Sequence, residues 1–76
     1  MTYEEARIEA KQFDQSHGSF WDRGSADSYY GRPINPHRGG VGGMSGPRIE
    51  AKTVEETQAY LAGYAFNEQF GGKKEY

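Results

Sequence analysis

The residues best suited to chemistry lie in one stretch, "WDRGSADSYYGRPINPH", residues 21–37. Two arginines occur there among aromatic rings and a histidine, and a third arginine follows directly. An arginine guanidinium is planar and binds phosphate, carboxylate or an aromatic face in a flat geometry, and a partly exposed tryptophan beside arginines is suited to contact a base or another protein. The stretch therefore predicts a surface that binds RNA or a protein partner. Its members are Trp21, Arg23, Tyr29, Tyr30, Arg32, His37 and Arg38.

The structural alternative is that Trp21 closes one end of a small core. The chain has 76 residues and only 34% hydrophobic residues, yet aromatic residues make up 14%. Because each ring covers a large apolar area, the aromatic side chains must form most of any core. The sequence alone leaves both interpretations of Trp21 open.

The charge distribution favours a binding surface in the middle of the chain. The net charge is −2, but residues 22–48 contain four arginines against two aspartates. That segment is therefore mildly basic, and the two ends of the chain are acidic. A basic patch attracts anionic partners, although four arginines are also compatible with ordinary solvated charge.

An enzyme or a metal site is not expected. The chain has no cysteine, which excludes disulfides and thiolate zinc sites, and its only histidines are His17 and His37. No nucleophile with a matching base can be assembled from the remaining residues. The glycine-rich residues 39–46 suggest a phosphate-binding loop, but they lack its Gly-Lys-Ser/Thr ending and a preceding strand. We expect no catalytic residue, no metal and no cofactor.

The N-terminal residues also indicate where the protein resides. They lack the basic segment and apolar run of a secretion signal. No window approaches the roughly 20 apolar residues of a membrane span. We therefore expect a cytoplasmic protein that does not contact a membrane.

The first element that positions the predicted surface is a long helix. Thr2 and Glu5 form a capping box, in which the two side chains satisfy backbone N–H groups at a helix start. From Tyr3 to Gly24, mostly small and aromatic residues recur at alternating spacings of three and four positions, which places them on one helical stripe. The pattern predicts a first helix over residues 2–30.

Glycines mark a break and an end in this helix. Gly18 is unfavourable in a helix interior, so a kink or a short break is expected near residues 16–19. Gly31 is suited to the left-handed conformation that ends helices, and Pro33 cannot continue one.

Residues 31–52 are expected to form a flexible connection. They hold all three prolines and many glycines, a composition that disfavours both a regular helix and a paired strand. Thr53 and Glu56 then repeat the capping box and predict a second helix, residues 53–70. Residues 71–76 are expected to be a frayed tail.

The fold class that follows is all-α, a single domain with two helices packed as an antiparallel hairpin. Glycines on both helices favour close backbone contact, with aromatic rings packed around it. Tyr60 and Tyr64 share one face of the second helix because they are four positions apart. The residues expected at this contact are Gly24, Tyr60, Leu61, Gly63 and Tyr64.

The motifs carry a family resemblance. Gly24, "GRP" at 31–33, "PH" at 36–37 and "YLAGY" at 60–64 resemble the ribosome modulation factor family and its CrpP-like relatives. The resemblance implies a two-helix fold and association with the small ribosomal subunit near the messenger exit region. It also implies RNA contacts by the arginines and aromatic residues between 21 and 38.

Two functional hypotheses follow. In the first, the protein is a non-enzymatic regulator of translation that binds the ribosome or ribosomal RNA through the surface between Trp21 and Arg38. In the second, it is a phage or mobile-element accessory protein that binds and inhibits a host protein through its acidic helix faces and flexible arm. The exposed edge at Trp21 is also compatible with a homodimer.

Overall fold

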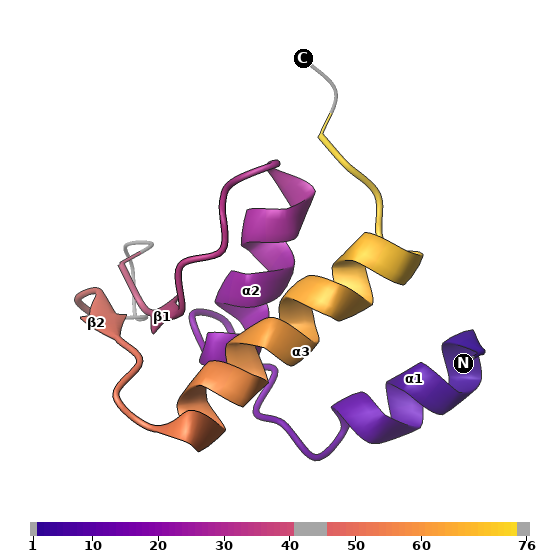
Figure 1. Cartoon of the computed structure of the whole chain (residues 1–76), viewed down its shortest axis with the longest axis horizontal. Helices are drawn as coiled ribbons and strands as arrows, with labels where there is room; N and C mark the ends of the chain where they lie inside the picture. The colour runs from indigo at the N-terminus through magenta and orange to yellow at the C-terminus, as the bar shows by residue number, and fades with distance from the viewer. Residues whose placement is uncertain (1, 41–45, 75–76) are drawn as a thin grey trace.

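The computed structural model describes residues 2–40 and 46–74, and within them the chain forms three helices and two short paired strands (Figure 1). The elements are α1 (Tyr3–Ala10), α2 (Phe20–Tyr29), β1 (His37–Arg38), β2 (Ile49–Glu50) and α3 (Val54–Phe70). The expected all-α two-helix hairpin is therefore wrong. The last helix, α3, has the bounds that its capping box and the following glycines predict.

The predicted first helix, residues 2–30, is two helices joined by residues 11–19. Gly18 adopts a φ of 85°, which a helix does not accommodate. Ser19 then caps α2, because its hydroxyl accepts a hydrogen bond from the backbone N–H of Asp22. The 3–4 spacing across this region is thus not helical, since local capping chemistry starts a new helix in a new direction. His17, expected on the helical stripe, is exposed in the connection.

The end of α2 follows the sequence expectation closely. Gly31 has a φ of 70° and its N–H donates to the carbonyl of Ser28 at 3.1 Å. The N–H of Arg32 reaches back to the carbonyl of Asp27 at 2.8 Å. These two bonds form a Schellman motif. The motif holds Arg32 next to the last turn of α2.

The described parts of the connection, residues 31–40 and 46–52, contain a short strand pair. His37 pairs with Glu50 and Arg38 with Ile49 in antiparallel register, so the expectation that no strand forms here is wrong. The glycines make this pairing possible rather than preventing it: Gly39, Gly40 and Gly46 all have positive φ values, which turn the chain sharply beside the strands. Most of the suggested phosphate-binding loop, residues 41–45, lies outside the described residues.

The packing of α2 against α3 depends on two glycines. A Cβ added to Gly24 would overlap the carbonyl oxygen of Tyr60, and one added to Gly63 would overlap the carbonyl oxygen of Trp21. The backbones of the two helices therefore approach too closely for any side chain at either position. Figure 1 shows α3 crossing α2 at this contact.

Aromatic rings connect α1 to the α2–α3 pair. The ring of Tyr3 lies 5.3 Å from that of Phe70 and 6.0 Å from that of Phe66. On the other side of Phe66, the Trp21 ring lies at 5.5 Å. Few contacts besides these rings hold α1, whose small residue Ala6 is buried.

Residues 73 and 74 contact α2, which corrects the expectation of a frayed tail for the described residues 71–74, while residues 75 and 76 lie outside the described residues. Lys73 Nζ donates to the carbonyl oxygen of Ser28 at 2.8 Å, and the backbone N–H of Lys74 donates to that of Tyr29 at 2.8 Å. The amide of Asn67 adds a bond to the Ser28 hydroxyl at 3.0 Å. Among the helices described here, none has the length and apolar character needed to cross a membrane.

Candidate anion-binding pocket

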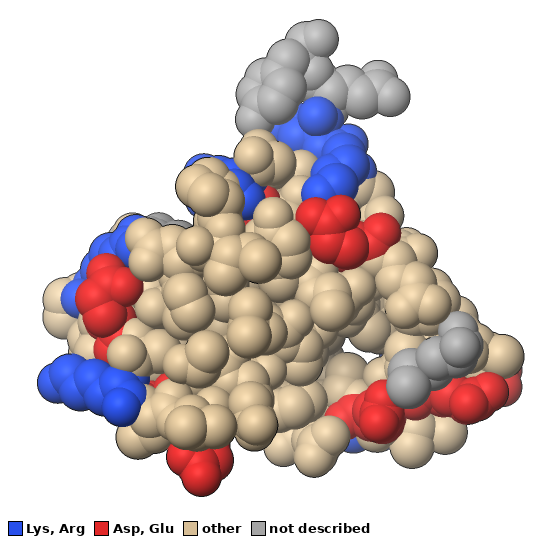
Figure 2. Space-filling view, in the orientation of Figure 1, with Lys and Arg blue, Asp and Glu red and all other residues tan. Residues whose placement is uncertain are grey.

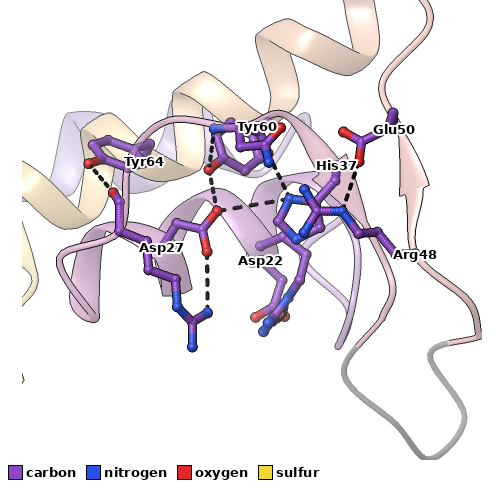
Figure 3. A network of polar contacts seen from close by, with 10 residues as sticks. Asp22, Asp27, His37, Arg48, Glu50, Tyr60 and Tyr64 are labelled. Atoms are coloured by element: carbon purple, nitrogen blue, oxygen red, sulfur yellow. Dashed lines mark hydrogen bonds and ion pairs between the residues drawn. The ribbon is translucent and has the colours of Figure 1, made fainter.

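A polar pocket of about 290 Å³ lies between the second half of α2 and the strand pair. Figure 3 shows the polar contacts around it. We call it the arginine pocket because three of its lining side chains are arginines. Its lining residues are Arg23, Asp27, Arg32, Pro33, Asn35, His37, Gly39, Gly40 and Arg48.

The floor of the arginine pocket is a buried hydrogen-bond network. Tyr60, fully buried on α3, donates its hydroxyl hydrogen to Oδ2 of Asp27 on α2 (Figure 3). The same hydroxyl accepts the backbone N–H of Asn35 at 3.1 Å. Burial, and then the hydrogen bond to Asp27, raise the pKa of Tyr60 well above its ordinary value. The Tyr60 hydroxyl is thus a neutral donor that ties three segments of the chain together.

His37 joins this network from β1. Its Nδ1 atom lies 2.7 Å from the carbonyl oxygen of Asn35 and 3.9 Å from Oδ2 of Asp27. Because a carbonyl oxygen only accepts, Nδ1 carries the hydrogen and donates it. The buried Asp27, which is 3% exposed, therefore faces a histidine as well as a tyrosine.

Two of the three arginines are positioned by residues of α2. The Nε and Nη2 atoms of Arg23 both contact Oδ2 of Asp22, at 3.3 and 2.9 Å, and its side chain is only 10% exposed. Arg32 Nη1 lies 3.4 Å from Oδ1 of Asp27, and its guanidinium stacks on the ring of Tyr30 at 4.7 Å. Arg32 stays 54% exposed, so most of its donors face solvent.

The third arginine comes from the other side of the pocket. Arg48 Nε donates to Oε1 of Glu50 at 2.8 Å, and this bond raises the pKa of Arg48. Its side chain is 44% exposed. Close contact with Gly40, where an added Cβ would lie 2.9 Å from the Arg48 Cβ, brings Arg48 to the pocket.

The arrangement of the lining residues is suited to bind an anion. Three guanidinium groups and His37 line the pocket around the buried carboxylate of Asp27, so the lining is rich in hydrogen-bond donors. Asp22 and Glu50, which lie outside the lining, pair with Arg23 and Arg48. Guanidinium donors match the oxygens of phosphate in distance and direction. In the described ranges, no group of three His, Cys, Asp or Glu side chains is arranged to hold a metal ion.

Acidic and basic side chains are unevenly distributed over the surface in Figure 2. Figure 2 shows acidic side chains along α1, at lower right. Lysine and arginine side chains are seen on the opposite side, near the strand pair, and near the C-terminal end. The arginines on the pocket side would attract an anionic partner, and the glutamates of α1 would repel one.

The residues expected to form one binding surface lie in three places. Arg23, Arg32 and His37 line the arginine pocket. Trp21 instead faces α1 and Phe66, and Arg38 lies over the ring of Phe20 at 5.9 Å.

The adjacent tyrosines occupy the third place, the C-terminal end of α2. Tyr29 and Tyr30 are both exposed there, and their rings meet edge to face at 5.0 Å. Tyr30 is connected to the pocket through the stacked Arg32.

Of the residues expected at the helix contact, four lie at or beside it. Gly24 and Gly63 touch the opposite backbone, Tyr60 is buried there, and the Tyr64 hydroxyl donates to the carbonyl of Arg32 at 2.9 Å. Leu61 is exposed.

Sequence reasoning missed Arg48, Asp27 and Asn35 as pocket residues. Arg48 lies 11 positions after His37, and only the pairing of β1 with β2 brings the two together. The sequence offered little signal for this pairing, because two-residue strands leave no alternating pattern and only the glycines next to both segments mark a turn.

Comparison of the chain with protein-family models, with curated proteins and with solved structures found no match.

Proposed function

We propose that the protein is a small, non-enzymatic, cytoplasmic regulator that binds ribosomal RNA through the arginine pocket. The observation that carries this proposal is the convergence of Arg23, Arg32, Arg48 and His37 on one pocket. Phosphate contacts by arginine position a protein on RNA, and they supply much of its affinity. The resemblance of "GRP" and "YLAGY" to the ribosome modulation factor family favours the ribosome as the source of that RNA.

Two features favour RNA over a small anion. Tyr29 is exposed beside Tyr30, whose ring lies against the cations Arg32 and Lys74, and an exposed aromatic ring near a phosphate-binding group is suited to stack on an unpaired base. Glu4 and Glu5 in the first turn of α1 disfavour a polyanion there, whereas the pocket side presents three arginines. A polyanion larger than the pocket would extend along the end of α2.

The proposal is tested by sedimentation of the protein with ribosomal particles at increasing salt. We expect cosedimentation at low salt and its loss as salt rises, because released counterions drive the binding. The variant carrying Arg32→Ala and Arg48→Ala should lose binding and show a shallower salt dependence. Both side chains are about half exposed, so these changes should leave the fold intact.

The matched control carries Arg7→Ala and Lys52→Ala, which remove the same charge away from the arginine pocket. It should bind ribosomal particles as the unaltered protein does. Equal loss in both double variants would mean that only net charge matters and would contradict a specific role of the pocket. No cosedimentation of the unaltered protein at any salt would refute the proposal.

A second candidate function is that of a phage or mobile-element accessory protein that inhibits a host protein. The observation in its favour is the outer face of α1, where Ile8 is 67% exposed between Glu4, Glu5 and Glu9. An apolar side chain ringed by carboxylates is suited to an apolar pocket with a basic rim on a partner protein. This candidate predicts that the unaltered protein captures one defined host protein and that Ile8→Asp abolishes this capture. It also predicts that neither the unaltered protein nor the variant is retained on RNA.

A further inference from the structure

The region between α1 and the α2–α3 pair is hollow rather than packed. Two pockets, of about 550 and 380 Å³, lie there and share four lining residues, Ala10, Phe13, Trp21 and Phe66. Figure 2 shows the molecule hollowed between α1 and the main body. We call the two adjoining pockets together the α1 groove. The larger pocket is lined mainly by polar surface and the smaller one mainly by apolar surface, so a groove of this size is suited to an amphipathic occupant.

One end of the α1 groove is cationic. Arg7 and Lys11 line the larger pocket together with Tyr3 and Gln15. Arg7 lies over the Tyr3 ring at 5.7 Å. Neither Arg7 nor Lys11 forms an ion pair with any carboxylate of residues 2–40 and 46–74. Two cations that form no ion pair in these ranges, in a pocket that also contains four aromatic rings, favour an anionic group.

The other end of the α1 groove is mainly apolar. Ala62, Ala65 and Phe70 of α3 line the smaller pocket, opposite Ala6 of α1. Glu9 is the charged residue at this end, and its carboxylate repels a second anionic group. The groove therefore has a direction, with an anionic head favoured at the Arg7 end and an apolar tail at the Phe70 end.

Trp21 gives a separate indication that the groove is incomplete. Its Nε1 atom is buried, and among the described residues no acceptor receives its hydrogen. Buried polar groups are nearly always paired in native proteins. Trp21 lines both pockets, so an oxygen of a molecule seated there, after a small adjustment of the ring, would supply the missing acceptor.

We propose that the α1 groove binds a single amphipathic anion, with an acyl chain against Ala62, Ala65 and Phe70 and a carboxylate against Arg7 and Lys11. A fatty-acid carboxylate and a monoalkyl phosphate share this chemistry. This site is separate from the arginine pocket, so the proposal does not rest on RNA binding.

The test uses the intrinsic fluorescence of Trp21, the only tryptophan of the chain. The full chain is titrated with dodecanoate below its micelle-forming concentration. We expect a saturable change in emission, because the ligand alters the surroundings of the indole. Dodecyl phosphate is titrated in parallel. It should change the emission as dodecanoate does if the groove accepts any anionic head group, and should bind more weakly if the groove prefers a carboxylate. Dodecyltrimethylammonium, with the same chain and the opposite charge, should bind at least about tenfold more weakly.

Variants separate the head-group contact from the tail contact. The exposed pair Arg7→Gln and Lys11→Gln should weaken dodecanoate binding about tenfold or more, with little change for dodecyltrimethylammonium. Ala65→Phe, which fills the apolar end from an exposed helix position, should weaken both. The control pair Arg48→Gln and Lys52→Gln removes the same charge outside the groove and should bind dodecanoate normally.

Three results would overturn the proposal. The first is that neither dodecanoate nor dodecyl phosphate gives a saturable response. The second is that dodecyltrimethylammonium binds as tightly as dodecanoate. The third is that the variant with Arg7→Gln and Lys11→Gln binds dodecanoate with unchanged affinity. Ribosome sedimentation of that variant distinguishes the two proposals, since loss of amphiphile binding should leave any RNA binding through the arginine pocket intact.

Discussion

Tyr60 and Asp27, 33 positions apart, are joined by a buried hydrogen bond from the tyrosine hydroxyl to the aspartate carboxylate. The bond links α3 to α2 directly beneath the arginine pocket. Because the hydroxyl also accepts the N–H of Asn35, it fixes the connection that carries His37. The geometry of the pocket therefore depends on one phenolic oxygen.

Removal of that oxygen should destabilise the protein. Tyr60→Phe leaves the Asn35 N–H and one Asp27 oxygen without their buried partner, which costs about 1–3 kcal/mol. Tyr64→Phe, which removes an accessible hydroxyl bonded to the Arg32 carbonyl, should cost less than about 1 kcal/mol. Urea unfolding followed by circular dichroism measures the free energy of unfolding of both variants. Equal losses would show that the buried Tyr60 hydroxyl stabilises the protein no more than the Tyr64 hydroxyl does.

Tyr60 also predicts a loss of stability at alkaline pH. Burial raises its pKa in the folded protein above the ordinary value of 10.0. As pH rises, the unfolded chain releases this proton before the folded protein does. The free energy of unfolding should therefore keep its full value below pH 10.0 and decrease above it. In Tyr60→Phe this fall should be smaller. The measurement is urea unfolding at a series of pH values, and parallel pH profiles for both proteins would argue against the raised pKa.

The two interface glycines should not tolerate a methyl group. Gly24→Ala and Gly63→Ala each place a Cβ on a carbonyl oxygen of the opposite helix, which forces the helices apart. Overpacking of this kind costs about 1–3 kcal/mol, and it opposes the roughly 1 kcal/mol that alanine gains in helix propensity. Gly72→Ala is the matched control, since an added Cβ there meets open space. Thermal unfolding should show a lowered Tm for the two interface variants only.

The capping box of α3 makes a local contribution that can be measured separately. The hydroxyl of Thr53 accepts the N–H of Glu56, and the Glu56 carboxylate accepts the N–H of Thr53 at 3.1 Å. Thr53→Ala should therefore destabilise the protein by about 1 kcal/mol. Thr53→Ser keeps the hydroxyl and should restore most of the stability. If serine and alanine behave alike in urea unfolding, the hydroxyl does not cap the helix.

Local chemistry explains which parts of the fold were predictable. Thr2 caps α1 through its hydroxyl alone, without the reciprocal Glu5 bond of the expected capping box, and Thr53 with Glu56 forms the full capping box of α3. Each signal lies within four residues, so both helix starts could be located from the sequence. Gly31 likewise ends α2 through a conformation that the sequence indicates. Each signal depends only on neighbours along the chain.

The features that were predicted wrongly from the sequence depend on contacts between distant segments. The stripe from Tyr3 to Gly24 continued through residues 11–19 by coincidence, because periodicity does not report whether Ser19 caps a new helix. The strand pair was missed since a two-residue ladder leaves no alternating pattern. With the break and the pairing unknown, Trp21 and Arg48 could not be assigned to their separate sites.

The loose attachment of α1 has a practical consequence for labelling. A fluorophore or affinity tag fused ahead of α1 would extend from the end of the molecule opposite the strand pair, as Figure 1 indicates. A tag placed after Lys73 would instead disturb the lysine that anchors the chain end to Ser28. Immobilisation through the N-terminal side thus leaves the arginine pocket facing the solution, where a partner can reach it.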